Sequence, residues 1–317
     1  SSFSENDMKK KKKNKKETVD VSIVPENDVK KKKKNKKETV DVSTVEIGID
    51  THRTIRNLII FCIAFEIFLV LIDAFINYNK FTDIGGIRRF CNIAREDSLA
   101  SWFGTTQTFM VGLTVWMIAL IMKHTSASKQ QLIGWCIIAA FFTYMAIDDG
   151  AEFHERMGSA FKAIAKRGDS ADGSWMASLL SFFPSYTWQI VFLPFFGAMG
   201  IFIAVFLWNE LKWKETRIFI ILGLTCFVIA VGLDFIEGLD KKHEWNIHTF
   251  LRNEFDLRKY TVRHFAKSIE EFLEMVGITL FWTAFLSHLS ILMRNGVRFS
   301  STSPKLPSEP SPPSIKS

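Results

Sequence analysis

Six apolar blocks constrain the fold of this chain more than any other feature of its sequence. They lie at residues 58–76, 103–122, 132–148, 186–208, 218–236 and 269–292. Each block has about 17–25 residues, the length of helix that crosses roughly 30 Å of hydrocarbon. Hydrophobic residues make up 48% of the chain and include 30 Phe, which is unusual for a soluble domain. We therefore predict an all-α integral membrane protein, a bundle of six transmembrane helices surrounded by the lipid bilayer.

The two ends of the chain differ sharply in composition from these blocks. The segment "ENDMKKKKKNKKETVDVSIV" at 5–24 recurs as "ENDVKKKKKNKKETVDVSTV" at 26–45. Such a polar repeat cannot bury a core, so we predict a disordered tail at 1–50 whose Lys residues could bind anionic lipid headgroups. The Ser/Pro-rich segment at 296–317 is a second predicted disordered tail, which leaves 51–295 as the transmembrane domain.

The formal charge of +7 belongs mostly to the first tail, because residues 1–45 contain 14 Lys and 8 acidic residues. The remainder is nearly neutral, so nothing suggests that the body binds nucleic acid. Basic residues in the short loops recur on one side of a six-span topology, and this bias predicts that both termini are cytoplasmic. The residues that carry the bias are Arg53, Arg56, Lys123, Lys129, Lys212, Lys214, Arg217, Arg294 and Arg298.

The third apolar block ends in an unusually charged stretch, "MAIDDGAEFHERMG" at 145–158. If the helix continues through it, Asp148, Glu152 and Glu155 share one face and His154 points away from that face. His154 could join them only if the helix unwinds or rotates near Gly150. Three carboxylates on one face repel one another unless a cation or a base lies between them.

The other predicted spans also carry acidic residues. Glu66 and Asp73 lie seven residues apart in the first span and so on one face, with Glu66 the deeper. In spans three, five and six the acids lie near the end predicted to face outwards. We therefore expect a carboxylate/His cluster at the outer ends of the helices. Its candidate members are Asp148, Asp149, Glu152, His154, Glu155, Asp234, Glu237, Glu270, Glu271 and Glu274.

Charged groups in a bilayer are costly and usually face the interior of a bundle, water or a partner, which leaves three hypotheses. The cluster could bind a divalent metal ion as its cofactor, since carboxylate and imidazole ligands suit such ions. It could be the pathway of a proton- or cation-coupled transporter, with Glu66 and Asp73 as a proton relay. It could also be an ion-pair network with bases such as Lys267, in an accessory or assembly subunit that binds other membrane-protein subunits.

Glu66 has no Lys or Arg near it in its span. Without a metal ion we expect this carboxyl to be protonated near neutral pH. Among the other histidines, we expect His288 to be a hydrogen-bonded residue of the bundle and His264 to lie at the surface. The sequence contains no GxSxG, HExxH, P-loop or GxGxxG motif, and no predicted span contains the Glu-x-x-His pattern of bundle di-iron sites.

Three segments together resemble a widespread group of uncharacterised bacterial polytopic membrane proteins. They are "REDSLASWF" at 95–103, "IDDGAEFHE" at 147–155 and "IEEFLEMVGITLF" at 269–281. The likeness covers roughly residues 58–292 and implies a bacterial inner-membrane protein without an assigned reaction. The residues that it marks are Asp148, Asp149, His154, Glu155, Glu270, Glu271 and Glu274.

Overall fold

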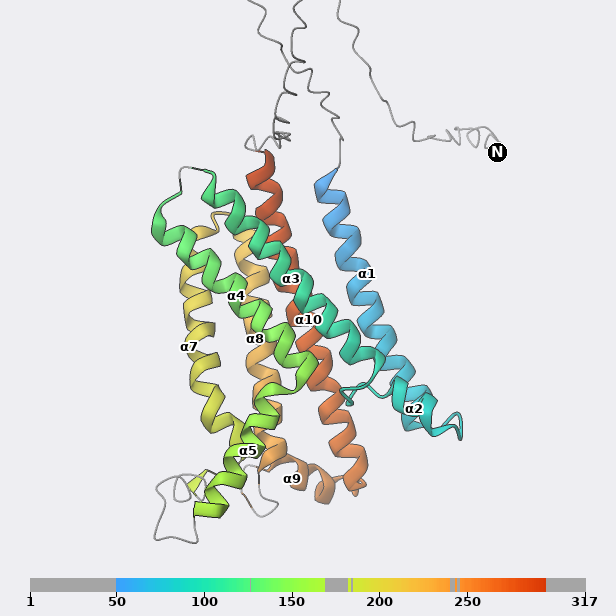
Figure 1. Ribbon diagram of the computed structural model, residues 1–317. Coiled ribbons are helices and arrows are strands. Elements are labelled where there is room, and N and C mark those ends of the chain that lie inside the picture. Colours follow the sequence, from blue (N-terminus) through green and yellow to red (C-terminus); the bar gives the residue numbers. More distant parts are fainter. Residues whose placement is uncertain are drawn as a thin grey trace, which may run out of the picture. The chain divides into compact units, whose positions relative to one another are not determined.

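Six long helices form the part of the protein that the computed structural model describes, namely residues 50–125, 127–168, 182–183, 185–239, 243 and 246–294. Each is long and apolar enough to cross a membrane, which confirms the predicted all-α, six-span class (Figure 1). In chain order they are α1 (Thr51–Ile72) continued by the π-helix η1 (Asp73–Tyr78), α3 (Leu99–Lys123), α4 (Lys129–Ala151), α7 (Thr187–Glu210), α8 (Lys214–Gly238) and α10 (Lys259–Arg294). The predicted tails at 1–50 and 296–317 lie outside the described residues, apart from Asp50.

Both described ends of the chain lie at one end of the bundle, as an even number of spans requires (Figure 1). The Arg294 Nη2 atom donates a hydrogen bond to Thr51 Oγ1 across 3.1 Å. Three shorter helices, α2 (Gly85–Cys91), α5 (Phe153–Gly168) and α9 (Ile247–Glu254), lie at the other end (Figure 1). We call that other end, where Asp73, Asp148, Asp234 and Glu270 are found, the acidic end.

Local sequence sets where several of these helices begin. The Ser98 hydroxyl accepts a hydrogen bond from the backbone of Ser101 and so caps α3. Ser128 and Gln131 form a reciprocal capping box at the start of α4. These caps satisfy backbone N–H groups that have no partner within the helix.

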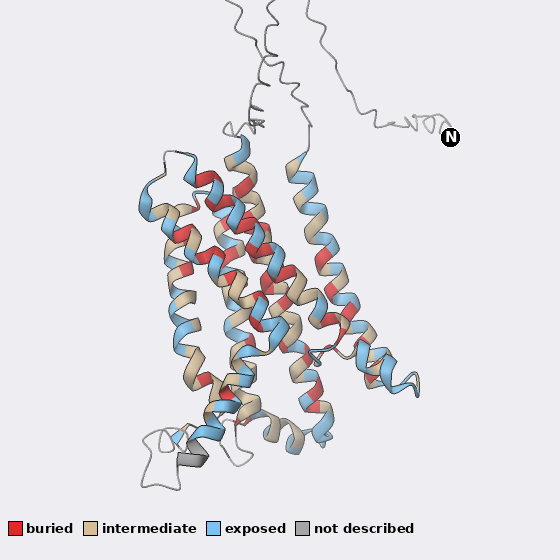
Figure 2. Cartoon of the chain, viewed as in Figure 1, coloured by how far each residue is buried: buried red, intermediate tan, exposed pale blue. Residues whose placement is uncertain are grey.

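The central helix of the bundle is α10, which packs against α8, α3 and α1. Glycines let α8 approach it closely, because a Cβ at Gly223 would lie only 3.1–3.2 Å from the Phe281 ring and the Gly277 carbonyl. Buried residues face inwards along the helices while much of the outward surface is exposed (Figure 2). Large apolar side chains on that outward surface, such as Phe61 and Val228, fit a lipid environment.

Candidate functional site

The charged stretch at 145–158 is a helix break and not the end of one long helix. Helix α4 stops at Ala151, Glu152 takes the left-handed conformation (φ 53°, ψ 35°), and α5 starts at Phe153. The expectation that Asp148, Glu152 and Glu155 share a helix face is therefore wrong. The turn leaves Asp148 buried on α4 and carries Glu155 onto α5, where it is exposed.

The break brings His154 back onto Asp148, as the sequence allowed if the helix opened near this point. The backbone N–H of His154 donates to Asp148 Oδ1 across 2.8 Å, and His154 Nδ1 lies 2.8 Å from Asp148 Oδ2. The imidazole packs edge-on against the Trp188 ring. One carboxylate thus orients the histidine and also satisfies a backbone donor at the start of α5.

Basic side chains partner the acids of α8 and α10 at the acidic end. Lys267 Nζ lies 2.7 Å from Glu270 Oε1 and 3.3 Å from Glu271 Oε1, so one ammonium group serves two carboxylates. Arg263 pairs with Glu237 across 2.8 Å. Glu270 is buried whereas Arg263 is exposed, and the two ion pairs therefore differ in how much water screens them.

The remaining candidates have separate partners. Asp234 accepts a hydrogen bond of 2.9 Å from Gln189 Nε2, and Asp149 accepts one of 2.9 Å from the Thr105 hydroxyl. Glu274 interacts electrostatically with several groups, which are Glu271, Lys267, Glu270 and Asp149. Among the residues that the structure describes, no group of three or more His, Cys, Asp or Glu is placed to hold a metal ion. Most of the ten candidates thus have small polar contacts of their own, while electrostatic interactions link Glu271 with Asp149, Glu155 and Asp234.

Glu66 lies deep in the bundle and is completely buried. Its Oε1 atom accepts hydrogen bonds from Gln107 Nε2 on α3 (3.0 Å) and from the Thr279 hydroxyl on α10 (2.5 Å). Gln107 Nε2 also contacts Thr279 Oγ1 at 2.5 Å. In the described part of the chain, Glu66 Oε2 and Gln107 Oε1 are buried without a hydrogen-bond partner. The group is therefore a carboxyl held by neutral donors, with one carboxyl oxygen and one amide oxygen unsatisfied.

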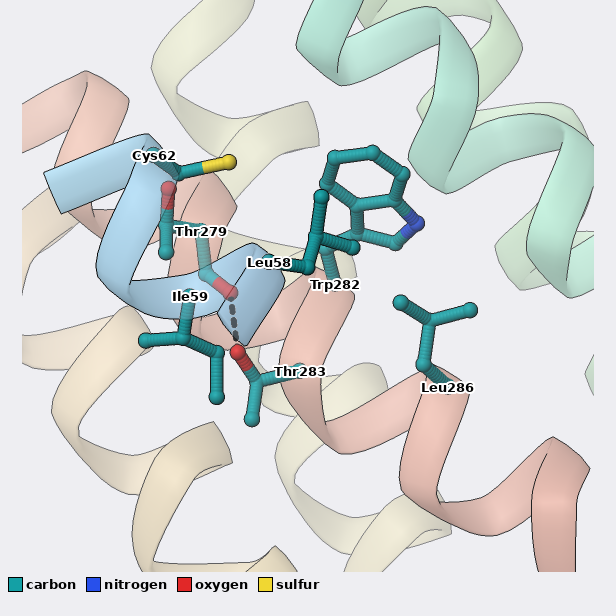
Figure 3. A pocket seen from close by; sticks show the side chains of 7 residues that line it. All are labelled: Leu58, Ile59, Cys62, Thr279, Trp282, Thr283 and Leu286. Carbon is teal, nitrogen blue, oxygen red and sulfur yellow. Dashed lines mark hydrogen bonds between the residues drawn. The ribbon is translucent and has the colours of Figure 1, made fainter. Parts of the chain in front are cut away.

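A shallow crevice between α1 and α10 adjoins this group (Figure 3). Its walls include Leu58, Cys62, Trp282 and Thr279, the last of which is also a partner of Glu66. The Thr283 hydroxyl donates to the carbonyl of Thr279 across 2.7 Å, so the helix itself satisfies it. Glu66 itself is not among the residues that line the crevice.

Asp73 is the second acid of the first span and is also buried, at the start of η1. His264 Nε2 lies 2.9 Å from Asp73 Oδ2, and both side chains are almost inaccessible to solvent. The expectation that His264 lies at the surface is therefore wrong. His288, expected to be hydrogen-bonded, is partly buried and stacks on Trp135, but its buried Nε2 atom has no hydrogen-bond partner among the described residues.

The segment before α3 carries two neighbouring acids with opposite behaviour. Partial desolvation, a hydrogen bond with Glu152 and the charge of Glu155 raise the pKa of Glu96 to about 8. The hydrogen bond with Glu96 lowers the pKa of Glu152. Hydrogen bonds from Arg89 and Arg95 lower the pKa of Asp97 to about 2. Glu96 and Glu152 thus form a carboxyl–carboxylate pair at the helix break.

Comparison with protein families adds one finding. The model of a domain of unknown function, DUF8692, matches residues 60–289, a range that reaches into all six spans. The chain belongs to this family. Neither the curated proteins nor the solved structures contain a match to it. DUF8692 membership agrees with the resemblance to an uncharacterised family and assigns no activity.

Sequence reasoning missed the neutral partners of the buried acids in this DUF8692 protein. The sequence prediction considered charged residues only and did not include Gln107 and Thr279. Each of these is an uncharged polar side chain inside an apolar block. A search for uncharged polar residues in the spans would have found both. Only the tertiary structure brings them together, because Glu66, Gln107 and Thr279 belong to three different helices.

Proposed function

We propose that this protein is a proton-coupled transporter that binds its proton at Glu66. The supporting observation is the hydrogen bonding of the Glu66 carboxyl. If Glu66 is ionised, both Glu66 Oε2 and Gln107 Oε1 are buried acceptors without a donor. Protonation of Glu66 Oε2 makes this oxygen a hydrogen-bond donor. The matching acceptor is the free Oε1 of Gln107, whose Nε2 already donates to Glu66 Oε1.

The surroundings of Glu66 support reversible protonation. A charge near the centre of a bilayer is costly, and the described neighbours that bond to Glu66, Gln107 and Thr279, are both neutral. Neutral donors can bond to either form of a carboxyl, whereas a cation would hold it ionised. The acidic end, predicted to face outwards, would supply protons to this site or release them from it.

Proton flux into liposomes tests the proposal. The purified protein is reconstituted around a pH-sensitive dye and a pH gradient is imposed. We expect Glu66→Gln to reduce the flux at least tenfold, because the amide keeps the shape and hydrogen bonds of the neutral acid but carries no exchangeable proton. Cys136→Ser, on α4, is a control inside the membrane that packs against the apolar core, and it should leave the flux within about twofold of wild type.

Infrared difference spectra provide a direct reading of the same group. Near neutral pH the wild-type protein should show a protonated carboxyl band of Glu66, which is absent from Glu66→Gln while the band of Glu96 remains in both proteins. Unchanged flux, or the absence of such a band, would overturn the proposal.

The same preparation tests the other two hypotheses. Elemental analysis that finds a divalent metal in stoichiometric amount, lost on Asp148→Ala, would support a metal cofactor held by the candidate residues of the acidic end. A metal-free protein that does not conduct protons but co-purifies with other membrane subunits would support the accessory role.

A further inference from the structure

The first span changes its helical geometry where it reaches the acidic end. Residues Asp73–Tyr78 form a π-helix, whose wider turn is rare and often marks a functional position. This turn places Asp73 and Asn77 on the buried side, with 2% and 5% of their surfaces exposed. The irregular turn of this span thus buries two polar residues against α10.

Asp73 has three partners at this position. Asn77 Nδ2 donates to Asp73 Oδ1 across 2.9 Å, and the Ser268 hydroxyl lies 3.2 Å from Asp73 Oδ2. His264 Nε2 lies 2.9 Å from the same Oδ2, close enough to form an ion pair but not aligned as a hydrogen bond. His264 is 6% exposed, so its Nε2 atom is a buried polar group, and among the described residues its ion-pair partner is this carboxylate.

Aromatic rings surround His264. Its imidazole stacks on Tyr78 (centroids 5.3 Å apart, 16° between planes) and on Tyr260 (5.6 Å, 15°). The Tyr78 hydroxyl is fixed by a 2.9 Å hydrogen bond with Thr261 Oγ1. Aromatic faces stabilise a cation, so this setting accepts a protonated imidazole as well as a neutral one. Tyr260 is 56% exposed, and the stack therefore connects His264 with the surface.

Most other charged groups on the adjoining helices have partners elsewhere. On α10, Lys267 pairs with Glu270 and Glu271, and Arg263 pairs with Glu237. Two shorter helices pack nearby, α2 against η1 and α9 against α10. The titratable groups of α2 are Arg88, Arg89 and Cys91, and Arg89 is paired with Asp97. Those of α9 are His248, Arg252 and Glu254. Of these, Cys91 interacts electrostatically with Asp73, and His248 interacts with Glu237 and Arg263. In the described part of the chain, the ion pair that includes Asp73 is the one with His264.

An apolar layer separates Asp73 from Glu66. Seven residues of helix correspond to about 10 Å, too far for direct proton transfer. Leu69 lies between the two acids on α1 and packs with Met275 of α10 in a small apolar cluster. Leu69 is 1% exposed and Met275 is 5% exposed. Protons can therefore pass between the two acids only when this layer opens or admits water.

We propose that Asp73 and His264 form a second proton-binding site, which exchanges protons with water at the acidic end and is insulated from Glu66 by Leu69 and Met275. A proton from water binds the imidazole, and the ring turns so that Nε2–H points at Asp73 Oδ2. The Nε2 proton then moves to the carboxylate, and this N–H bond breaks as the O–H bond forms, which leaves a neutral imidazole. This inference rests on the proposed function, because it assigns the entry or exit step of the same pathway.

Proton flux in the reconstituted full-length protein tests this site. We expect His264→Gln and Asp73→Asn to lower the flux at least tenfold. His288→Gln is the matched control, a partly buried histidine on the same helix at the other end of the bundle, and should change the flux less than twofold. Leu69→Ala should raise passive proton leak several-fold because it opens the insulating layer.

Ser268→Ala covers the case in which the stronger variants do not fold. The small change removes a hydroxyl that is shared between the His264 carbonyl (2.9 Å) and the Asp73 carboxylate (3.2 Å). The carboxylate loses this donor, so the pH midpoint of the flux should move upwards while the maximal flux is retained. If Glu66→Gln abolishes flux while His264→Gln does not, or if Ser268→Ala leaves the pH midpoint unchanged, this site is refuted and the proposed function stands. If Glu66→Gln itself has no effect, the proposed function fails first.

Discussion

The acids of this protein are held in two different ways, one along the α1/α10 interface and one at the ends of α8 and α10. Glu66 is held by the neutral groups of Gln107 and Thr279. Glu270 and Glu271 share the ammonium group of Lys267, and Glu237 pairs with Arg263. The first arrangement tolerates a neutral carboxyl, whereas the second depends on ionised ones.

The difference suggests a division of roles. Ion pairs fix the orientation of groups but resist protonation, because the proton would have to displace the attraction of the cation. Neutral hydrogen bonds let a carboxyl change its protonation state without losing its partners. We therefore assign proton binding to the α1/α10 interface and mainly structural roles to the ion pairs of α8 and α10.

The largest expected effect comes from removing the cation that two carboxylates share. Lys267→Met should lower the free energy of unfolding by about 3–5 kcal/mol, because it leaves the buried Glu270 carboxylate uncompensated. Thr279→Val at the other region removes a neutral hydrogen bond and should cost only about 1–2 kcal/mol. Unfolding in detergent measures both. Equal losses would contradict the proposed difference between the two regions.

A smaller effect, of opposite sign, is expected at the helix break. Glu152 has a positive φ, which costs a residue with a side chain about 1–2 kcal/mol and costs glycine little. Glycine also makes the unfolded chain more flexible, which offsets part of this gain. Glu152→Gly should therefore stabilise the fold by about 0.5–1 kcal/mol and raise the thermal midpoint slightly. A lower midpoint would mean that the Glu152 side chain, through Glu96 and Arg156, contributes more than the backbone strain costs.

The smallest expected effect is a pH dependence in the segment before α3. The folded state raises the pKa of Glu96 from 4.5 to about 8, so it binds more protons than the unfolded state between these values. Stability from this group is complete below pH 4.5 and is lost as the pH rises through about 8. Because Glu96 is exposed, solvent weakens the effect.

Thermal midpoints across this pH range, compared between wild type and Glu96→Gln, measure that contribution. The substituted protein should show a smaller decrease in midpoint from pH 4.5 to 8. Asp97→Asn is the neighbouring control. The lowered pKa of Asp97, about 2, adds stability above pH 3.8 that disappears only as the pH falls. This variant should therefore have a lower midpoint than wild type but show the same decrease in midpoint from pH 4.5 to 8.

The sequence by itself determined the class of this protein and the number of its spans. Blocks of apolar residues at the length of a bilayer leave few alternatives to membrane helices, because every backbone polar group in hydrocarbon must be satisfied within its own segment. It also identified Glu66 as the deepest acid, since helical rise converts position along a span into depth. Each of these properties can be predicted from a single segment of the chain without knowing how the segments pack.

Only the tertiary structure decided what each acid contacts. The left-handed turn at Glu152 returns His154 to Asp148, and a single backbone dihedral of this kind is not encoded by helical periodicity. The pairing of Asp73 with His264 joins residues that are far apart in the chain and depends on the π-helix at the end of α1. Such contacts follow from how helices rotate and pack against one another, which their separate apolar patterns leave open.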